Sequence, residues 1–388
     1  MRLRNVAILS VCQAIGFCGV PVVLLIGGIV GAGLAPSPAW ATLPITSMVV
    51  GTALSTVPAA LLMERAGRRL GFVLSAVIAA FACLGAIYAI ASASFLGFCL
   101  ATLALGVHTA FLQQYRFAAA ESVERRYAGR AVSLLLVGGA VAGYVGPEIA
   151  RLTKDLLSYG AYSGSFLVLA GLYALVAVIL VFLQDVARKT QAVGEPARPL
   201  RTVLAQPSYL AAAWCGIVAY AVMSFVMTAT PTSMLLIDHH TLAETTVVIQ
   251  AHILAMYVPS LFTGFLIDRL GAVRLKLLGV LFMGLSVTLA PLGHHFAGYL
   301  VELVLMGLGW NLLFIGGTVS LTRSYRPSER FKAQGMNDLL IFGIQAPVTL
   351  AAGWVIYQAN WEMLNLLTLP LLLVTFVVVV RTRQVAES

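Results

Sequence analysis

The hydropathy of the chain constrains its fold more than any other feature, because long apolar runs follow one another from end to end. Each run is long enough to cross a bilayer as a helix, which takes about 20 mostly apolar residues. Short breaks rich in Pro, Gly or charged residues separate the runs. Twelve runs are found, at 5–33, 41–63, 70–91, 95–117, 131–150, 161–183, 208–230, 245–267, 274–292, 298–321, 334–356 and 362–380. The sequence therefore predicts an all-α membrane protein with twelve transmembrane helices.

The composition excludes the main soluble classes. Of the 388 residues, 60% are hydrophobic and only 10% are charged, whereas a soluble domain carries roughly 25% charged residues. Too few polar side chains remain to cover a soluble surface, which excludes a cytosolic enzyme and a disordered chain. The net charge of +9 comes from short basic clusters between the apolar runs, so we expect a lipid bilayer and no nucleic acid as partner.

The basic clusters also predict the orientation. With the N-terminus inside, only Arg151 and Lys154 of the 24 Lys and Arg residues fall on the outer side. Basic loops are retained in the cytoplasm, so both termini are predicted to be cytoplasmic. The first run is too long for a cleaved signal peptide, although Ala39-Trp40-Ala41 resembles a cleavage site. Short loops without an Asn-x-Ser/Thr site favour a bacterial inner membrane.

The cysteines give no indication of a metal or a disulfide. All five lie inside apolar runs, without a Cys-x-x-Cys pair and without His residues at zinc-ligand spacing. Such residues are expected to pack as small apolar side chains. No phosphate-binding glycine loop is present either. We therefore expect no metal, no cofactor and no direct use of ATP.

An internal repeat divides the chain. With a shift of 204 positions, Ala60–Arg68 aligns with Gly264–Ala272, and Arg126-Tyr127 aligns with Arg330-Phe331. The repeat predicts an N-terminal six-helix half (1–184), a cytoplasmic central loop (185–207) and a C-terminal six-helix half (208–388). Parallel repeats of six spans are typical of transporters.

The loop after the second run resembles the signature of the major facilitator superfamily, roughly Gly-x-Leu-Ala-Asp-Arg-x-Gly-Arg-Arg. Ala60 stands in place of the first glycine and Glu64 in place of the aspartate, and the second copy lacks the final basic pair. The matching positions, in the two copies, are Glu64, Arg65, Gly67, Arg68 and Arg69, then Gly264, Asp268, Arg269 and Gly271. The resemblance implies two halves that rock about a central site, with alternating access from the two sides.

The motif has a physical interpretation as a gate. Gly67 and Gly271 permit a tight turn that a side chain would strain. Glu64 and Asp268, at helix ends, are placed to face the positive N-terminus of a neighbouring helix. We also expect Arg65 to pair with Glu121. Such contacts would latch the halves in one state; the alternative is that these residues only fix the topology.

Two departures disfavour a drug/proton antiporter. Family members of that type carry an arginine four positions before a glycine in the fourth span, where this chain has Thr102 before Gly106. The glycine pattern of the fifth span is broken by Glu148. These differences weaken an assignment to drug efflux.

Polar side chains within spans are costly and usually face a cavity. The third, sixth, ninth and twelfth runs lack strongly polar interiors, so these four helices are expected outside and the other eight around a central path. The candidates for the cavity are Gln13, His108, Gln114, Arg116, His252, Trp310, Asn311 and Gln345.

Several of these candidates have two interpretations. Arg116 either binds an anion or acts in gating, or it reaches the inner membrane surface as an anchor. His108 either carries a proton or contacts solute, or it forms an interhelical hydrogen bond. Asp338 is either a helix-start charge near Arg330 or Lys332, or a proton carrier. Glu302, by contrast, is expected to be solvated near the outer surface.

These observations predict a monomeric secondary transporter for a small polar or weakly anionic organic solute, coupled to protons. The alternative is efflux of drugs or metabolites by proton antiport. An enzyme is not expected, because the spans contain no His-x-x-x-His and no paired acids at one depth. Gln113–Glu121 and Gly309–Gly317 resemble a bacterial branch of the superfamily that includes vitamin and riboflavin transporters.

Overall fold

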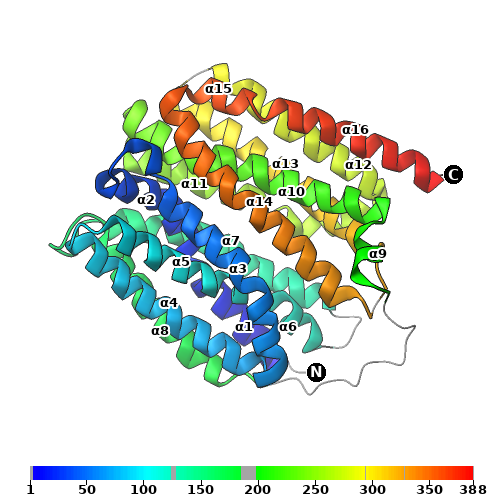
Figure 1. The fold of residues 1–388 in the computed structure, drawn as a ribbon, viewed down its shortest axis with the longest axis horizontal. Coiled ribbons are helices and arrows are strands. Elements are labelled where there is room, and N and C mark those ends of the chain that lie inside the picture. The colour runs from blue at the N-terminus through cyan, green and yellow to red at the C-terminus, as the bar shows by residue number, and fades with distance from the viewer. Residues whose placement is uncertain (1–2, 124–127, 185–197, 293, 327, 388) are drawn as a thin grey trace.

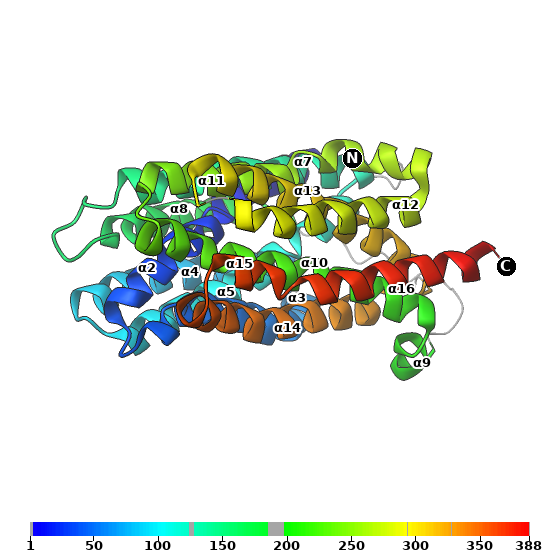
Figure 2. The same cartoon turned by 90° about the horizontal axis from the view of Figure 1, so that it is seen from above.

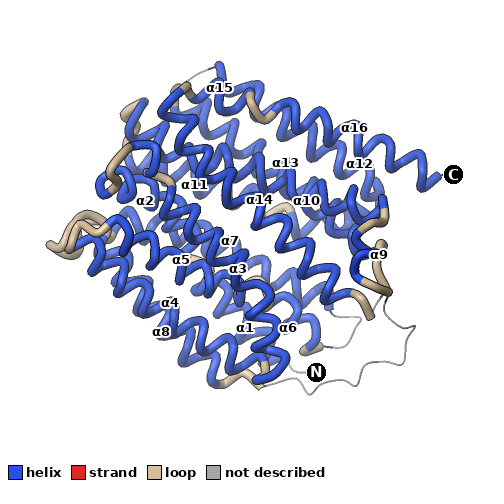
Figure 3. Tube along the Cα trace, viewed as in Figure 1, coloured by secondary structure: helices blue, strands red, loops and turns tan. Residues whose placement is uncertain are grey.

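The computed structural model describes residues 3–123, 128–184, 198–292, 294–326 and 328–387. This part of the chain consists of helices and short loops and contains no strand (Figure 3). The helices run along one common direction, and both termini lie at the same end of the bundle (Figures 1 and 2). We call the end that holds the termini and α9 (Leu200–Leu204) the terminal end, and the end that holds α15 (Trp361–Leu366) the opposite end.

The helices form two groups. The N-terminal group consists of α1 (Leu3–Gly16), α2 (Gly19–Leu34), α3 (Leu43–Ala66), α4 (Arg68–Ala91), α5 (Phe95–Leu112), α6 (Tyr115–Glu121), α7 (Ala128–Leu152) and α8 (Ser163–Val181). The C-terminal group consists of α10 (Pro207–Thr232), α11 (Leu242–Tyr257), α12 (Ser260–Leu289), α13 (Phe296–Thr322), α14 (Arg330–Gln358), α15 and α16 (Leu369–Glu387). The groups meet where α2 packs on α10, α3 on α14 and α7 on α11.

The prediction of an all-α membrane protein is confirmed. Within the described residues, eleven helices are long and apolar enough to cross a membrane. The remaining predicted run, 131–150, lies within α7, a helix of 25 residues that packs against α1, α2 and α11. Large apolar side chains are exposed on the four helices expected outside, α4, α8, α12 and α16, as at Phe81 and Phe376, and also on α3 and α7, as at Leu54 and Tyr144.

The first span is broken between α1 and α2. Pro21 has no amide hydrogen, so the Phe17 carbonyl lacks its α-helical donor and accepts instead from the Val20 amide at 3.1 Å. Gly19 lies so close to Tyr173 that a Cβ would be 1.9 Å from the phenol oxygen. The break therefore needs glycine and proline at these positions, and it turns Phe17 toward the centre of the bundle.

The fourth predicted span is also broken, at Gln113 and Gln114 between α5 and α6. The Arg68 guanidinium donates from Nη1 to the carbonyl oxygen of Gln114 at 3.2 Å. Gly67, directly before Arg68, has φ 87° and separates α3 from α4, and Gly271 in α12 has φ 77°. The signature arginine thus holds the break that positions Arg116 at the start of α6.

Three side chains of the predicted gating motif are not described by the structure, those of Glu64, Glu121 and Asp268. The expected pair of Arg65 with Glu121 therefore stays a prediction. Arg65 and Arg69 are exposed at the terminal end, and the Arg269 guanidinium lies 4.5 Å from the centre of the Phe265 ring.

Two glycines bring α3 and α5 into close contact. A Cβ on Gly106 would lie 2.0 Å from the Met48 carbonyl oxygen, and one on Gly51 would lie 2.1 Å from the Leu103 carbonyl oxygen. The Thr52 hydroxyl donates to the Gly106 carbonyl at 3.1 Å. Small residues allow such close approach between membrane helices, and here they fix the helix that forms one wall of the central cavity.

The expectation that Glu302 is solvated is wrong. Its side chain, two turns into α13, is only 2% exposed. The Trp361 indole donates to its Oε2 at 3.1 Å, and the Trp361 ring packs 5.0 Å from the ring of Tyr299. The sequence places this glutamate near the end of a span, but α15 folds across that end and covers it.

Candidate substrate cavity

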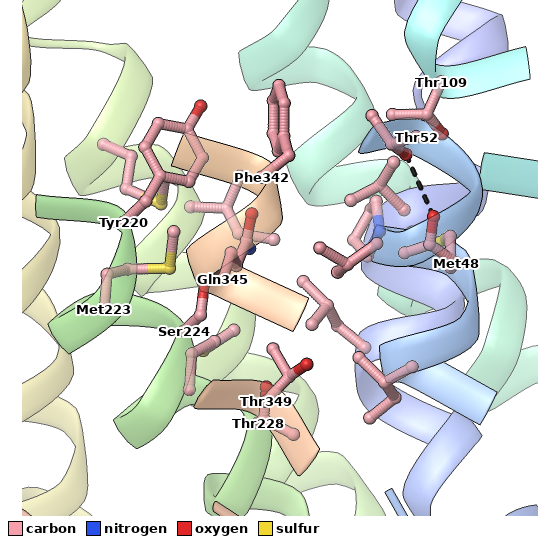
Figure 4. A pocket seen from close by; sticks show the side chains of 18 of the residues that line it. Met48, Thr52, Thr109, Tyr220, Met223, Ser224, Thr228, Phe342, Gln345 and Thr349 are labelled. Atoms are coloured by element: carbon pink, nitrogen blue, oxygen red, sulfur yellow. Dashed lines mark hydrogen bonds between the residues drawn. The ribbon is translucent and has the colours of Figure 1, made fainter. Parts of the chain in front are cut away.

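A cavity of about 100 Å³ lies between the two helix groups. Its walls come from the break before α2, from α2, α3 and α5 on one side, and from α10, α11 and α14 on the other. Figure 4 shows Met48 and Thr52 on α3 opposite Gln345 on α14 and Ser224 on α10. Because both helix groups contribute, a relative movement of the groups changes the shape of this cavity.

The cavity wall is mostly apolar, and aromatic rings and methionines form a large part of it. Within the described part of the chain, no Asp, Glu, Lys or Arg side chain lines it. An apolar wall with a few well-placed polar groups is typical of small-molecule sites, and methionines adapt readily to the shape of a ligand. The rings and thioethers are Phe17, Tyr220, Tyr257, Phe342, Met48, Met223, Met227 and Met256, and the amides are Gln113 and Gln345.

Tyr220, which is itself part of the wall, is the centre of an aromatic cluster. Its ring lies 5.2 Å from Trp310, 5.2 Å from Phe314 and 5.6 Å from Phe342, in edge-to-face arrangements. Trp310 stacks on Phe314 at 4.9 Å. Buried rings with defined partners move little, so the Tyr220 ring is held in place where a flat ligand can pack against it.

The polar groups of the wall are partly engaged with the protein. Gln345 donates from Nε2 to the Ser224 hydroxyl at 2.5 Å. His252 contacts the Leu303 carbonyl oxygen through Nδ1 at 2.7 Å. The second polar atom of each side chain, Oε1 of Gln345 and Nε2 of His252, is buried without a hydrogen-bond partner. Both atoms are therefore available to a bound solute.

A second hollow continues the cavity toward the terminal end. It shares Gln113, Tyr220 and Phe342 with the cavity and adds Arg116 and Asp338. Nη2 of Arg116 on α6 lies 3.3 Å from Oδ2 of Asp338 on α14. This ion pair joins the N-terminal to the C-terminal helices on that side of the cavity.

A polar contact between the groups also lies toward the opposite end. The hydroxyls of Thr46 on α3 and Thr349 on α14 are 3.0 Å apart. Farther along α14, a Cβ on Gly353 would lie 2.1 Å from the Thr42 hydroxyl oxygen. The two helix groups are thus in contact on both sides of the cavity.

The structure brings four of the predicted polar residues together at this site. His252 and Gln345 line the cavity, and Arg116 and Asp338 line the second hollow, which continues the cavity toward the terminal end. The sequence interpretation of Asp338 as a partner of Arg330 or Lys332 did not include Arg116, from which Asp338 is separated by 222 positions.

The other predicted residues lie away from the cavity wall. His108 contacts the Ser75 hydroxyl at 3.2 Å inside the N-terminal group, and Gln13 is beside Gly138 where α1 meets α7. Asn311 is fully bonded: its amide nitrogen donates to the Met256 carbonyl and the Ser260 hydroxyl, and its oxygen accepts from Thr263. Trp310 packs edge-to-face against the Tyr220 ring, and the backbone carbonyl of Gln114 accepts a hydrogen bond from Arg68.

The aromatic side chains that line the cavity were not identified from the sequence. Tyr220, Phe342 and Phe17 lie in apolar runs, as do Phe81 and Tyr88, which face outward and are 68% and 75% exposed. No local pattern separates a ring that faces lipid from one that faces a cavity. A weak signal was available for Phe17, because glycines and a proline flank it.

Comparison with known proteins identifies the class to which this architecture belongs. A family model of the Major Facilitator Superfamily matches residues 6–249 and 212–388. The chain belongs to this superfamily and is a multi-pass membrane transporter of a small-molecule solute rather than an enzyme. The resemblance found in the sequence is thereby confirmed.

Curated relatives match nearly the whole chain. The riboflavin transporter RfnT of Brucella anthropi is 38% identical over 377 residues, which cover 96% of this chain and 94% of RfnT. The uncharacterized MFS-type transporter YdeG of Bacillus subtilis is 30% identical, with 98% of this chain and 92% of YdeG covered. The relatives are thus bacterial and of similar length.

Solved structures share the fold at low sequence identity. An inward-facing, occupied structure of a bacterial homologue of the human lysosomal transporter Spinster has a TM-score of 0.73 at 12% identity, with 99% of this chain and 97% of that chain covered. A point mutant of the nucleoside transporter NupG also has a TM-score of 0.73 at 12% identity, with 97% and 99% covered. At this identity the similarity concerns the fold alone.

Proposed function

We propose that the protein transports a small, flat, uncharged heterocycle, with riboflavin as the leading candidate. The observation that carries this proposal is the wall of the central cavity: rings and methionines from both helix groups, two amides, and no charged side chain among the described lining residues. The 38% identity to a riboflavin transporter over nearly the full chain supports the same solute.

A weakly anionic solute is less favoured by this geometry. The sequence made Arg116 the residue to hold an anion, but its guanidinium is already paired with Asp338 at 3.3 Å. An anion would have to replace that carboxylate, whereas a neutral ring leaves the pair intact. We therefore place the ring of the solute between Tyr220 and the N-terminal helices, and assign Arg116 to gating.

The proposed mechanism is alternating access between two halves, 1–184 and 208–388, joined by the central loop. The contacts between Arg116 and Asp338 and between Thr46 and Thr349 lie on the two sides of the cavity. Breaking one contact while keeping the other would open one side alone. We propose that the terminal end faces the cytoplasm from a bacterial inner membrane, as the basic clusters favour, and that the protein acts as a monomer.

Coupling to protons is part of the proposal. Two buried carboxyl groups support it, Asp338 beside the cavity and Glu302 in α13, which are 9% and 2% exposed. Ionisable groups held away from water in a membrane protein commonly serve proton movement. Collapse of the proton gradient should therefore abolish accumulation of the solute, and accumulation that survives a protonophore would refute the coupling.

Riboflavin uptake by cells that cannot make riboflavin tests the proposal. The protein should support growth at low external riboflavin, and Tyr220→Leu should slow uptake about tenfold or more by removing an aromatic surface of the cavity. Tyr88→Leu is the matched control, because Tyr88 faces outward on α4. Faster loss of riboflavin from loaded cells would show export instead, and no change in either direction would exclude riboflavin as the solute.

A further inference from the structure

The hydrogen-bond partner of His252 fixes which ring nitrogen carries its proton. A carbonyl oxygen can only accept, so the 2.7 Å contact with the Leu303 carbonyl requires the hydrogen on Nδ1. The ring is fully buried. A buried charge without an ion-pair partner is costly, and among the described residues no acidic side chain pairs with His252, so the ring is neutral and Nε2 holds a lone pair.

That lone pair has no partner in the protein. Nε2 of His252 is buried and makes no hydrogen bond, and the residue lines the central cavity. The two nitrogens lie on different edges of the imidazole ring, so Nε2 faces away from the carbonyl that binds Nδ1. A buried acceptor without a donor costs free energy, and a solute in the cavity can remove that cost.

Gln345 repeats this arrangement on another helix. Its Nε2 donates to the Ser224 hydroxyl, which leaves Oε1 as a buried acceptor without a partner. The cavity thus presents one free acceptor from α11 and another from α14. This set complements a solute that carries donors, either ring N–H or hydroxyl O–H groups.

We infer that Nε2 of His252 accepts a hydrogen bond from an N–H or O–H group of the transported solute and thereby selects solutes that carry this donor. The inference rests on the proposed function, since it concerns the same cavity. In this inference His252 recognises the donor group of the solute, and the aromatic side chains of the cavity wall pack against its flat ring. Discrimination arises because a solute without the donor leaves Nε2 unpaired.

His108 provides a matched control within the same chain. It is also a buried histidine, its Nδ1 also has a protein partner, the Ser75 hydroxyl, and its Nε2 also lacks a partner. It differs in place, because it packs inside the N-terminal helices beside Tyr173 and is absent from the cavity wall. A general effect of losing a buried histidine would appear at both positions.

The test measures binding of riboflavin and two analogues to the purified protein through flavin fluorescence. The analogue 3-methylriboflavin lacks the ring N–H, and lumiflavin lacks the hydroxyl chain, so together they identify the donor. The unaltered protein should bind riboflavin about 10- to 100-fold more tightly than the analogue that lacks the donor bound by His252. His252→Phe should weaken riboflavin binding by a similar factor and lose this discrimination.

Two further variants make the outcome decisive. His108→Phe should keep the discrimination, and His252→Gln, which can donate to Leu303 and still offer an acceptor, should restore part of it. The inference fails if His252→Phe discriminates as the unaltered protein does, if His108→Phe loses discrimination equally, or if neither analogue binds more weakly. Absence of any riboflavin binding by the unaltered protein would instead remove the proposed solute and, with it, this inference.

Discussion

Arg116 and Asp338 are separated by 222 positions in the sequence, and yet Nη2 of one lies 3.3 Å from Oδ2 of the other. The pair joins α6 of the N-terminal helices to α14 of the C-terminal helices beside the cavity. Under the proposed alternating access, a contact in this position between the groups would have to break when the terminal end opens. Loss of either charge should therefore disturb transport more than it disturbs folding.

Exchange of the two charges tests this gate. Reversal of one charge of a shielded pair removes the attraction and brings two like charges together, so Arg116→Asp and Asp338→Arg should each reduce riboflavin uptake about tenfold or more. The double variant re-forms the pair in reverse and should recover most of the rate. Uptake is measured at matched amounts of protein in the membrane. A double variant as slow as the single ones would argue against the pair as a gate.

The close contact of α3 with α5 should make Gly106 sensitive to substitution. A Cβ there would lie 2.0 Å from the Met48 carbonyl oxygen, and forcing extra atoms into a packed interior costs about 1–3 kcal/mol. Gly106→Ala should lower the melting temperature of the purified protein by several degrees. Gly171→Ala is the control, since nothing lies within 4 Å of the added Cβ. Equal melting temperatures for the two variants would contradict the prediction.

A histidine outside the spans should make stability depend on pH. His294 lies 2.7 Å from Oε1 of Glu362 and 2.8 Å from Oδ2 of Asp238, and these carboxylates raise the pKa of His294 above its usual value of 6.5. A raised pKa means that the stabilisation is complete below 6.5 and is lost as the pH rises through the raised value. The side chain is 42% exposed, so solvent limits the effect to less than about 1 kcal/mol.

The measurement for His294 is the melting temperature at pH 6 and pH 9. His294→Gln should reduce the difference between the two values, and the exposed neighbour His295 offers the control His295→Gln. An unchanged difference in His294→Gln would show that this histidine does not set the pH dependence.

The end of the central loop is fixed to the C-terminal helices by a double ion pair. Arg198 donates from Nε and Nη2 to the two carboxylate oxygens of Glu329, each at 2.7 Å, and its backbone amide donates as well. These contacts lower the pKa of Glu329 to about 2. The stabilisation is therefore complete above 4.5, the usual pKa of a glutamate, and is lost progressively as the pH falls from there through about 2.

Glu329→Gln removes the charge and should free this segment. Trypsin should then cleave after the exposed Arg201 several-fold faster, because local opening limits cleavage in a folded protein. Glu148→Gln is the control, since Glu148 pairs with Arg151 in α7, which lies before the central loop in the chain. Unchanged cleavage in Glu329→Gln would show that other contacts hold the segment.

The fold was largely predictable because its main determinants are local. Runs of about 20 apolar residues fix the positions of the helices, and Gly67 and Gly271 mark turns that need positive φ. The breaks near Pro21 and Gln113 were not anticipated, although each lies within a predicted run. Both depend on a distant side chain that occupies or holds the break, Tyr173 in the first case and Arg68 in the second.

The site was only partly predictable. Polarity within a span drew attention to His252, Gln345, Arg116 and Asp338, which line the cavity or the hollow beside it, because a polar group in lipid is costly. The same criterion selected His108 and Asn311, which form hydrogen bonds inside a helix group instead. Polarity shows that a side chain needs a partner, and it does not show whether that partner is another helix or a solute.

The sequence by itself determined that this chain crosses the membrane many times as helices, because a helix satisfies its backbone hydrogen bonds within one segment. Its repeat and its signature loop determined the superfamily. The tertiary structure alone decided that Tyr220 faces a cavity while Tyr88 faces outward, and that Arg116 meets Asp338. Both depend on how separate helices pack against each other, and that packing is set by contacts between residues far apart in the sequence.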